Sequence, residues 1–417
     1  MKNPWSFRRS GGVAAVALAG LALTLSSCND DNNNYYCCVG TINVPNSVAL
    51  ADVNGDGTLD LLVATTADQG LAQNPGFANV ILNSKSAPGT FSKGVPYPTT
   101  GNNPSSIAVA DLTGSGFLDM VVANVTGSVS VYIHGTTPGT FKAAVNLSTG
   151  GAPNQVVLAD VNGDGLPDIV LADFSASGNV IVLHQDPANP GQFLAPVRLP
   201  TGAATASVAV ADLNGDGAAD IVATGYDNYG NNGAVYVFYQ VAAQPGTFLS
   251  PVTYPAGAAP QSVKIADMNG DGLPDLIVAN YGPGADGTGI PGVSILLQNA
   301  SKPGTFLTPA SYLTFGGSVD VAVADLNGDG KPDVVVASLG PPPTGSISVL
   351  LQDPAHPGVL LGASGYPAFG QPLGVAIGDL NDDGLPDIAA ADGTSAIVLL
   401  QLSGKPGQFA NPVQVGQ

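Results

Sequence analysis

The chain has 417 residues, and only 10% of them are charged. All 31 acidic residues are Asp, and with 11 Lys and Arg the formal net charge is −20, which argues against nucleic acid and anionic lipid headgroups as partners. The sequence has no Glu, 55 Gly and 34 Pro, a composition that disfavours helices and predicts an all-β fold with many turns.

Residues 1–27 are predicted to be a signal peptide rather than part of the fold. A basic start, "MKNPWSFRR", precedes an apolar run over residues 11–25, and "LSSC" ends at Cys28. The run is shorter than the roughly 20 residues that cross a bilayer as a helix, so a plain membrane anchor is the weaker alternative. The segment resembles a bacterial lipoprotein signal peptide, and this resemblance implies that Cys28 is lipidated and becomes the first residue of the mature protein.

Lipid on Cys28 predicts a protein anchored in the bacterial cell envelope, on its periplasmic or cell-surface side. Residues 28–43, which include "NDDNNNYY", are predicted to form a polar tether between the lipid and the folded domain. The adjacent Cys37 and Cys38 can close only a strained vicinal disulfide, so the sequence offers no disulfide framework.

An acidic nonapeptide, "DVNGDGLPD" at residues 160–168, recurs along the chain with a period of 49 to 59 residues. This period, together with the β composition, predicts propeller blades, each of which is a small sheet that needs neighbours to bury its faces. The seven copies begin at Asp52, Asp111, Asp160, Asp212, Asp267, Asp325 and Asp379.

Each repeat divides into four expected strands. Apolar runs such as "SVALAD" and "DLLVAT" enter and leave the acidic loop, and strands that are apolar on both faces fit between adjacent sheets. A third run follows, and a fourth comes after a "PGTF" or "PGQF" turn. In four repeats this last run carries a Pro, which belongs on an outer edge because it cannot donate to a ladder.

Residues 44–417 are therefore predicted to form a seven-bladed propeller with four antiparallel strands per blade, ordered from the centre outward. An open solenoid is the alternative. The last repeat keeps its own fourth strand, "GQFANPVQV", so a strand borrowed from residues 35–43 could close the ring but is not required.

The nonapeptide pattern D-x-N-x-D-G-x-x-D places side-chain oxygens at positions 1, 3, 5 and 9, and a backbone carbonyl is expected at position 7. Several ionised oxygen ligands in a loop turned by Gly match what Ca²⁺ prefers. An EF-hand needs a Glu at position 12 between two helices, whereas this chain has no Glu and strands are expected on both sides. The loops thus predict calcium, with solvated Asx turns as the alternative.

The loops, the period and the "FG" dipeptides at Phe315-Gly316 and Phe369-Gly370 resemble the FG-GAP repeats of integrin α-subunit propellers and their bacterial VCBS-type relatives. The resemblance covers the chain beyond residue 44. It implies structural calcium ions that stiffen the face away from the ligand. Six loops match at all four positions, and the predicted ligands are Asp52, Asn54, Asp56, Asp60, Asp160, Asn162, Asp164, Asp168, Asp212, Asn214, Asp216, Asp220, Asp267, Asn269, Asp271, Asp275, Asp325, Asn327, Asp329, Asp333, Asp379, Asn381, Asp383 and Asp387.

The second loop departs from this pattern. It retains only two carboxylates, Asp111 and Asp119, with Thr113 and Ser115 between them. This loop is predicted to bind calcium weakly or not at all, which leaves about six structural ions.

A partner is expected at the opposite end of the blades, because binding residues concentrate on loops held by a rigid scaffold. The loops there vary most in length and lie at 65–79, 225–233, 280–292 and 338–345. They combine rings with hydrogen-bonding groups suited to protein or glycan contact, although plain solvated loops are the alternative. The candidate partner-binding residues are Tyr226, Asp227, Tyr229, Asn231, Tyr281 and Asp286.

The sequence favours a non-catalytic binding or adhesion module, and no catalytic residue is predicted. A polysaccharide-binding lectin and a calcium-dependent polysaccharide lyase are the alternatives. The only Trp, Trp5, lies in the signal segment, which counts against a lectin. The remaining basic residues are too few for the groove that a lyase would need, and the Asp outside the loops show no pairing that indicates a glycosidase.

Overall fold

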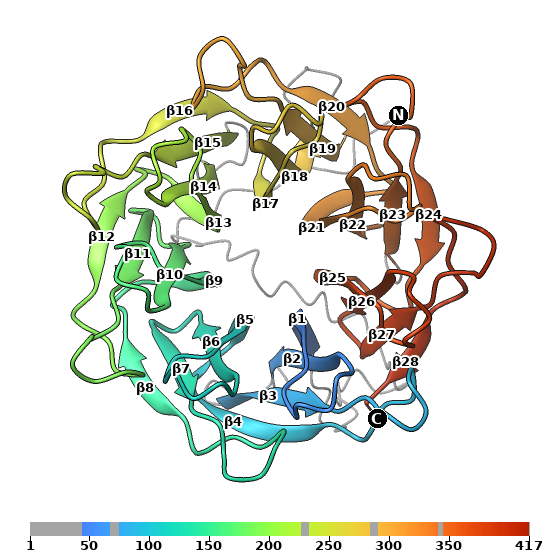
Figure 1. Cartoon of the computed structure of the whole chain (residues 1–417), viewed down its shortest axis with the longest axis horizontal. Coiled ribbons are helices and arrows are strands. Elements are labelled where there is room, and N and C mark those ends of the chain that lie inside the picture. Colours follow the sequence, from blue (N-terminus) through green and yellow to red (C-terminus); the bar gives the residue numbers. More distant parts are fainter. Residues whose placement is uncertain (1–43, 67–74, 227–232, 284–290, 341–344, 417) are drawn as a thin grey trace, which may run out of the picture.

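The computed structural model describes residues 44–66, 75–226, 233–283, 291–340 and 345–416. These residues form seven four-stranded antiparallel sheets arranged in a closed ring (Figure 1). Each sheet is one blade and is continuous in the chain, which confirms the predicted all-β, seven-bladed propeller. Among the described residues, no helix is long and apolar enough to cross a membrane.

The first four blades contain the following strands: blade 1, β1 (Val44–Ala51), β2 (Asp60–Thr66), β3 (Pro75–Ile81) and β4 (Val95–Asn102); blade 2, β5 (Pro104–Ala110), β6 (Asp119–Asn124), β7 (Ser128–Tyr132) and β8 (Val145–Ser148); blade 3, β9 (Pro153–Ala159), β10 (Asp168–Asp173), β11 (Asn179–Leu183) and β12 (Val197–Pro200); blade 4, β13 (Ala204–Ala211), β14 (Asp220–Tyr226), β15 (Gly233–Phe238) and β16 (Val252–Pro255).

The last three blades contain these strands: blade 5, β17 (Pro260–Ala266), β18 (Asp275–Pro283), β19 (Pro291–Leu296) and β20 (Ala310–Leu313); blade 6, β21 (Gly317–Ala324), β22 (Asp333–Leu339), β23 (Ser346–Leu350) and β24 (Ser364–Pro367); blade 7, β25 (Gly374–Gly378), β26 (Asp387–Ala391), β27 (Ala396–Leu399) and β28 (Val413–Val415).

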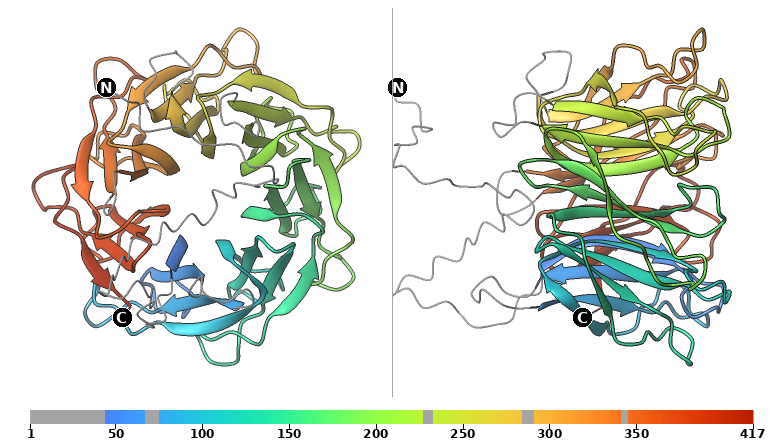
Figure 2. Two further views of the ribbon diagram at one scale, coloured as in Figure 1. Left: turned by 180° about the vertical axis from the view of Figure 1, so that it is seen from behind. Right: turned by 90° about the vertical axis from the view of Figure 1, so that its left-hand side faces the viewer.

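The first strand of every blade lies at the centre of the ring and the fourth lies at the rim, as the outer Pro residues predicted (Figure 1). Figure 2 shows the ring from behind and edge-on. Because neighbouring strands are antiparallel, all seven acidic loops lie at one end of the blades, which we call the loop face. The links that lead from one blade to the next lie at the other end, which we call the far face.

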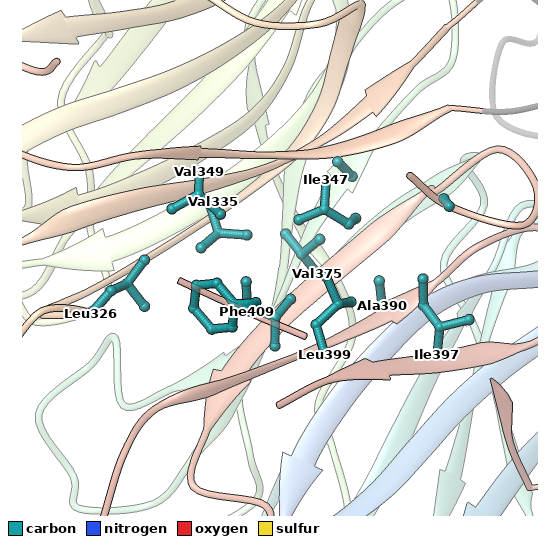
Figure 3. Packing of buried hydrophobic residues seen from close by; sticks show 12 residues of the cluster. Leu326, Val335, Ile347, Val349, Val375, Ala390, Ile397, Leu399 and Phe409 are labelled. Carbon is teal, nitrogen blue, oxygen red and sulfur yellow. The ribbon is translucent and has the colours of Figure 1, made fainter. Parts of the chain in front are cut away.

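The hydrophobic core lies between adjacent blades rather than at the centre of the ring. One cluster joins Val335, Ile347 and Val349 of blade 6 to Ile388 and Leu399 of blade 7 (Figure 3). Both faces of the second strand are covered, because β6, β10 and β26 are buried at every position. This explains why these strands read as continuous apolar runs rather than as alternating ones.

Blades 1 to 6 each contact the acidic loop of the blade that precedes them around the ring. In blade 2, the turn between the third and fourth strands brings Gly139 against Asn54 of blade 1, where an added Cβ would lie 3.2 Å from the Asn54 Cβ. The Gly139 N–H donates to the Val53 carbonyl at 3.1 Å. The Gly of the "PG" turn therefore permits close contact between neighbouring blades.

Leu399 is fully buried between blades 6 and 7. The substitution Leu399→Ala should lower the free energy of unfolding by about 2–5 kcal/mol, because it leaves a cavity there. Val413→Ala is the matched control, since Val413 is 61% exposed at the rim of the same blade. Urea unfolding of both variants measures the difference. Equal effects of the two substitutions would contradict a core between the blades.

Candidate functional site

The acidic loops owe their shape to carboxylates that accept hydrogen bonds from their own backbone. In blade 1, Asp52 accepts from the N–H groups of Gly55, Asp56 and Gly57 at 2.7, 3.1 and 2.8 Å. The Asn54 Oδ1 accepts from the Asp56 N–H at 2.8 Å. Gly55 and Gly57 have φ of 72° and 96°, a region that side chains other than Gly disfavour, although Asp382 takes the first of these positions in blade 7 with φ of 57°.

The last Asp of each loop is completely buried and joins three parts of its blade. The Asp60 carboxylate accepts from the Val53 N–H at the loop start (3.1 Å) and from the Asn83 N–H beyond β3 (2.8 Å). The same two backbone bonds recur in every blade. The equivalent residues are Asp119, Asp168, Asp220, Asp275, Asp333 and Asp387.

Burial raises the pKa of Asp60 to about 6, because the charged form loses solvation that its two backbone hydrogen bonds only partly replace. The nearby carboxylates of Asp56 and Asp52 raise this pKa further by repulsion. The pKa is likewise raised to about 6, with burial as the largest cause, in four other blades, at Asp220, Asp275, Asp333 and Asp387.

The donor types of the loops fit a hard divalent cation, since each intact loop offers several carboxylate and amide oxygens beside a buried carboxylate. The side chains are nevertheless directed to hydrogen bonds within the loop, such as the bond from Asn162 Nδ2 to Asp164 Oδ2 at 3.1 Å. Within the described ranges, no group of three or more His, Cys, Asp or Glu side chains is arranged to hold a metal ion. Calcium therefore stays a prediction that rests on the chemistry of the donors.

The second loop differs from the others in structure as well as in sequence. His134 occupies the position that holds an amide side chain in the other blades, and its Nδ1 lies 2.8 Å from the buried Asp119 Oδ1. The Phe117 ring, which is 50% exposed, stacks on the imidazole with centroids 5.2 Å apart. An imidazole thus contacts the buried carboxylate, as His184 Nδ1 also does with Asp168 Oδ2 at 3.1 Å in blade 3, and the one missing carboxylate of the second loop did not predict this contact.

Five glutamines form a repeated latch that the sequence analysis missed. The Gln185 Nε2 donates to the Pro167 carbonyl at 2.8 Å, and its Oε1 accepts from the Gly191 N–H at 3.0 Å. The constant spacing of Gln and the following "PG" turn was a visible signal of this contact. The equivalent residues are Gln240, Gln298, Gln352 and Gln401.

Of the six predicted partner residues, the structure describes Tyr226 and Tyr281. Tyr226 is only 6% exposed, stacks edge-on against Phe174, and accepts a hydrogen bond from Gln261 Nε2 at 3.0 Å. Its ring is therefore part of the packing between blades, which corrects the expectation that it contacts a partner. Tyr281 is 37% exposed, on the far face. The other candidates, Asp227, Tyr229, Asn231 and Asp286, lie outside the described residues, as does Cys28.

Two exposed phenylalanines on the far face were not predicted as partner residues. Phe315 and Phe369 lie in the links to blades 6 and 7 and are 56% and 49% exposed. Together with Tyr281 they form what we call the aromatic patch. The links after blades 1 to 4 carry no ring at this position, where they have Thr100, Gly150, Gly202 and Gly257.

Small residues let these rings lie close to the backbone. A Cβ added to Gly365 would lie 2.8 Å from the Phe315 ring, and one added to Gly317 would lie 2.6 Å from the Tyr281 ring. A shallow pocket of about 270 Å³ opens beside Phe369, and Pro367, Ala368, Asn411 and Pro412 complete its lining. The aromatic patch is thus confined to blades 5 to 7.

The ring and its repeated acidic loops define a class, that of β-propellers built from blades with an acidic loop between the first two strands. The profile of the FG-GAP-like repeat matches residues 52–122, 111–171, 160–223, 228–278 and 269–336. The chain belongs to this family, as the resemblance indicated. No curated protein matches the chain.

Solved structures share the architecture at low identity. BBS1N in complex with ARL6DN, soaked with lead, matches with a TM-score of 0.55 at 12% identity, over 89% of this chain and 100% of that one. The periplasmic gluconolactonase PpgL of Pseudomonas aeruginosa matches with a TM-score of 0.52 at 19% identity, over 76% of this chain and 85% of that one. Both likenesses concern the fold alone.

The buried carboxylates predict an unusual pH dependence in calcium-free buffer. Five aspartates have a pKa raised from 3.8 to about 6, so the folded chain takes up these protons before the unfolded chain does. The free energy of unfolding should therefore rise as the pH falls from about 7 to about 4. Urea unfolding in excess EGTA at several pH values measures it, and a steady loss of stability over this range would contradict the raised pKa values.

Proposed function

We propose that this protein is a calcium-stabilised propeller, anchored by lipid on Cys28 in a bacterial cell envelope, that binds a protein or glycan partner without catalysis. The observation that carries the proposal is the aromatic patch. Exposed rings that gather in one sector of an otherwise repetitive scaffold are typical of binding surfaces, since each ring buries a large area at a low cost in side-chain entropy.

The distribution of charge also supports calcium binding on the loop face and partner binding on the far face. Of the 31 Asp, 21 lie in the acidic loops on the loop face. On the far face Asp173 and Asp392 are buried, and their carboxylates accept hydrogen bonds from neighbouring backbone, such as that from the Ala152 N–H to Asp173 at 2.8 Å. The aromatic patch therefore offers an apolar surface away from the strongest negative field, which suits a neutral partner better than an ionic one.

A lectin and a polysaccharide lyase are the alternatives. Stacking of sugar rings on Tyr281, Phe315 and Phe369 would favour the lectin. Catalysis would be supported by turnover of a polysaccharide or of a lactone, the latter because one structural neighbour is named a gluconolactonase. A binding module best accounts for an aromatic patch beside a shallow pocket.

The calcium part of the proposal predicts a higher melting temperature in excess calcium than in excess EGTA. A ligand present at 100 times its Kd stabilises the folded state by about 2.7 kcal/mol per site. Asp164→Ala should remove one of about six bound ions, whereas Ser115→Ala, in the incomplete second loop, should leave the ion count unchanged. Elemental analysis of the dialysed protein counts the ions, and equal melting temperatures in calcium and EGTA would refute this part.

The binding part predicts that the domain after Cys28 captures a ligand from a polysaccharide array or, failing that, a protein from envelope extracts. Phe315→Ala and Phe369→Ala should each weaken that binding roughly tenfold, as loss of a ring at the centre of an interface does. Phe117→Ala is the matched control, because this ring is equally exposed but lies on the loop face. If all three variants bind as the parent does, the aromatic patch is not the binding surface.

A further inference from the structure

The ring closes at one junction that differs from the other six. A link in the chain joins each blade to the next from blade 1 through to blade 7. Between blade 7 and blade 1 no such link exists within the described residues, and neither sheet takes a strand from the other. We call this junction the seam. Its stability depends on side-chain and backbone contacts alone.

The packing at the seam combines small and large side chains on the blade 7 side. Its core includes Ala389, Ala391 and Ala396 beside Leu380 and Val398, and these face residues of blade 1 such as Leu61 and Ile81. A small side chain leaves less apolar surface to bury and fewer atoms in contact. Specific contacts at the seam add to this apolar packing.

One close fit at the seam departs from the repeat. The residue before the acidic loop is Ala in blades 1 to 6 but Gly378 in blade 7. A Cβ added at Gly378 would lie 2.6 Å from Leu59 Cδ1, so the absence of a side chain makes room for Leu59 of blade 1. In addition, the Gly94 N–H of blade 1 donates to the Gly416 carbonyl beyond β28 at 3.2 Å.

Asn83 is the second departure from the repeat at the seam. It stands where five blades have the latch Gln, and it is 3% exposed. Its Nδ2 donates to the Leu59 carbonyl of its own blade at 3.1 Å and to the Leu380 carbonyl of blade 7 at 2.8 Å. Its Oδ1 accepts from the Gly89 N–H at 3.0 Å.

No latch Gln among the described residues makes a comparable bond to the preceding blade. Each of the five donates to a carbonyl of its own blade, as Gln240 does to Ala219 at 2.7 Å and Gln401 does to Pro386 at 2.8 Å. An Asn is one methylene shorter, and at this position its amide reaches both blades. This side-chain bond is found at the junction that lacks a link in the chain, whereas at the junction of blades 1 and 2 the equivalent Val53 carbonyl accepts from a backbone N–H, that of Gly139.

We propose that Asn83 is the clasp that closes the ring, and that the seam between blades 7 and 1 is where the ring opens first. Asn83 Nδ2 donates a hydrogen bond to the carbonyl of Leu380, the second residue of the last acidic loop. Gly89 packs beside it, since a Cβ added there would lie 3.3 Å from the Asn381 Cβ. Loss of the clasp therefore removes one hydrogen bond between the last acidic loop and blade 1. This inference stands whether or not the loops bind calcium or the far face binds a partner.

The test is native-state hydrogen exchange on the full chain, read by mass spectrometry for each blade. Asn83→Gln retains the two bonds within blade 1 that the latch glutamines make, and it removes the bond to Leu380. Amides of blades 1 and 7 should then exchange roughly fivefold faster, as expected for one buried hydrogen bond, with the other five blades unchanged. Gln240→Asn is the matched control, and its effect should stay within blade 4.

Faster exchange that spreads equally over all seven blades, or exchange at blades 1 and 7 that is unchanged in Asn83→Gln, would overturn the proposal. A second variant, Asn83→Leu, removes all three side-chain bonds and should enlarge the same local effect. If Asn83→Leu fails to fold while Gln240→Leu folds, that result also supports the clasp, because the two substitutions remove the same bonds within a blade and differ in the bond across the seam.

Discussion

The structure depends on one repeated interaction, the pair of hydrogen bonds that a buried carboxylate accepts from two backbone amides. Asp60 shows the pattern, since it joins the start of the acidic loop to the residue that follows the third strand. A blade of four short strands has few other means to fix the relative positions of its first three strands. Because a carboxylate accepts several bonds at once, one side chain per blade meets this need.

The burial of this carboxylate is also unfavourable, and the sequence of the loop reflects this. A buried carboxylate is poorly solvated, and two further carboxylates nearby repel it, as the raised pKa of Asp60 indicates. A cation in the loop would offset both effects, whereas solvent alone does not. In blade 2 the loop has two carboxylates instead of three, and His134 contacts the buried Asp119. An imidazole also contacts the buried carboxylate in blade 3, where His184 Nδ1 lies 3.1 Å from Asp168 Oδ2 although that loop keeps all three carboxylates, so this contact does not depend on the lost charge.

Sequence patterns predicted the ring and its loops well because they repeat. The period, the apolar runs and the outer Pro residues specify seven blades and the order of their strands. Side-chain exposure on the far face was predicted poorly, as Tyr226 and Phe315 show. Tyr226 is buried because Phe174 of the neighbouring blade covers it, a contact between residues 52 positions apart that no local pattern contains. Phe315 belongs to a dipeptide that resembles the family's, yet its exposed ring lies against Gly365 of the next blade, where an added Cβ would be 2.8 Å away, a contact 50 positions along the chain.

The direction of the first strand bears on how the molecule would be oriented. Val44 pairs with Thr66 and Ala51 pairs with Asp60, so β1 runs from the far face toward the loop face. The chain therefore enters the propeller at the end that carries Tyr281, Phe315 and Phe369. If residue 28 bears lipid as proposed, the tether joins the propeller at the face that carries the rings rather than at the face that carries the acidic loops. The sixteen residues of the tether would then keep the point of entry on this face within about 55 Å of the lipid, the length of the tether at full extension.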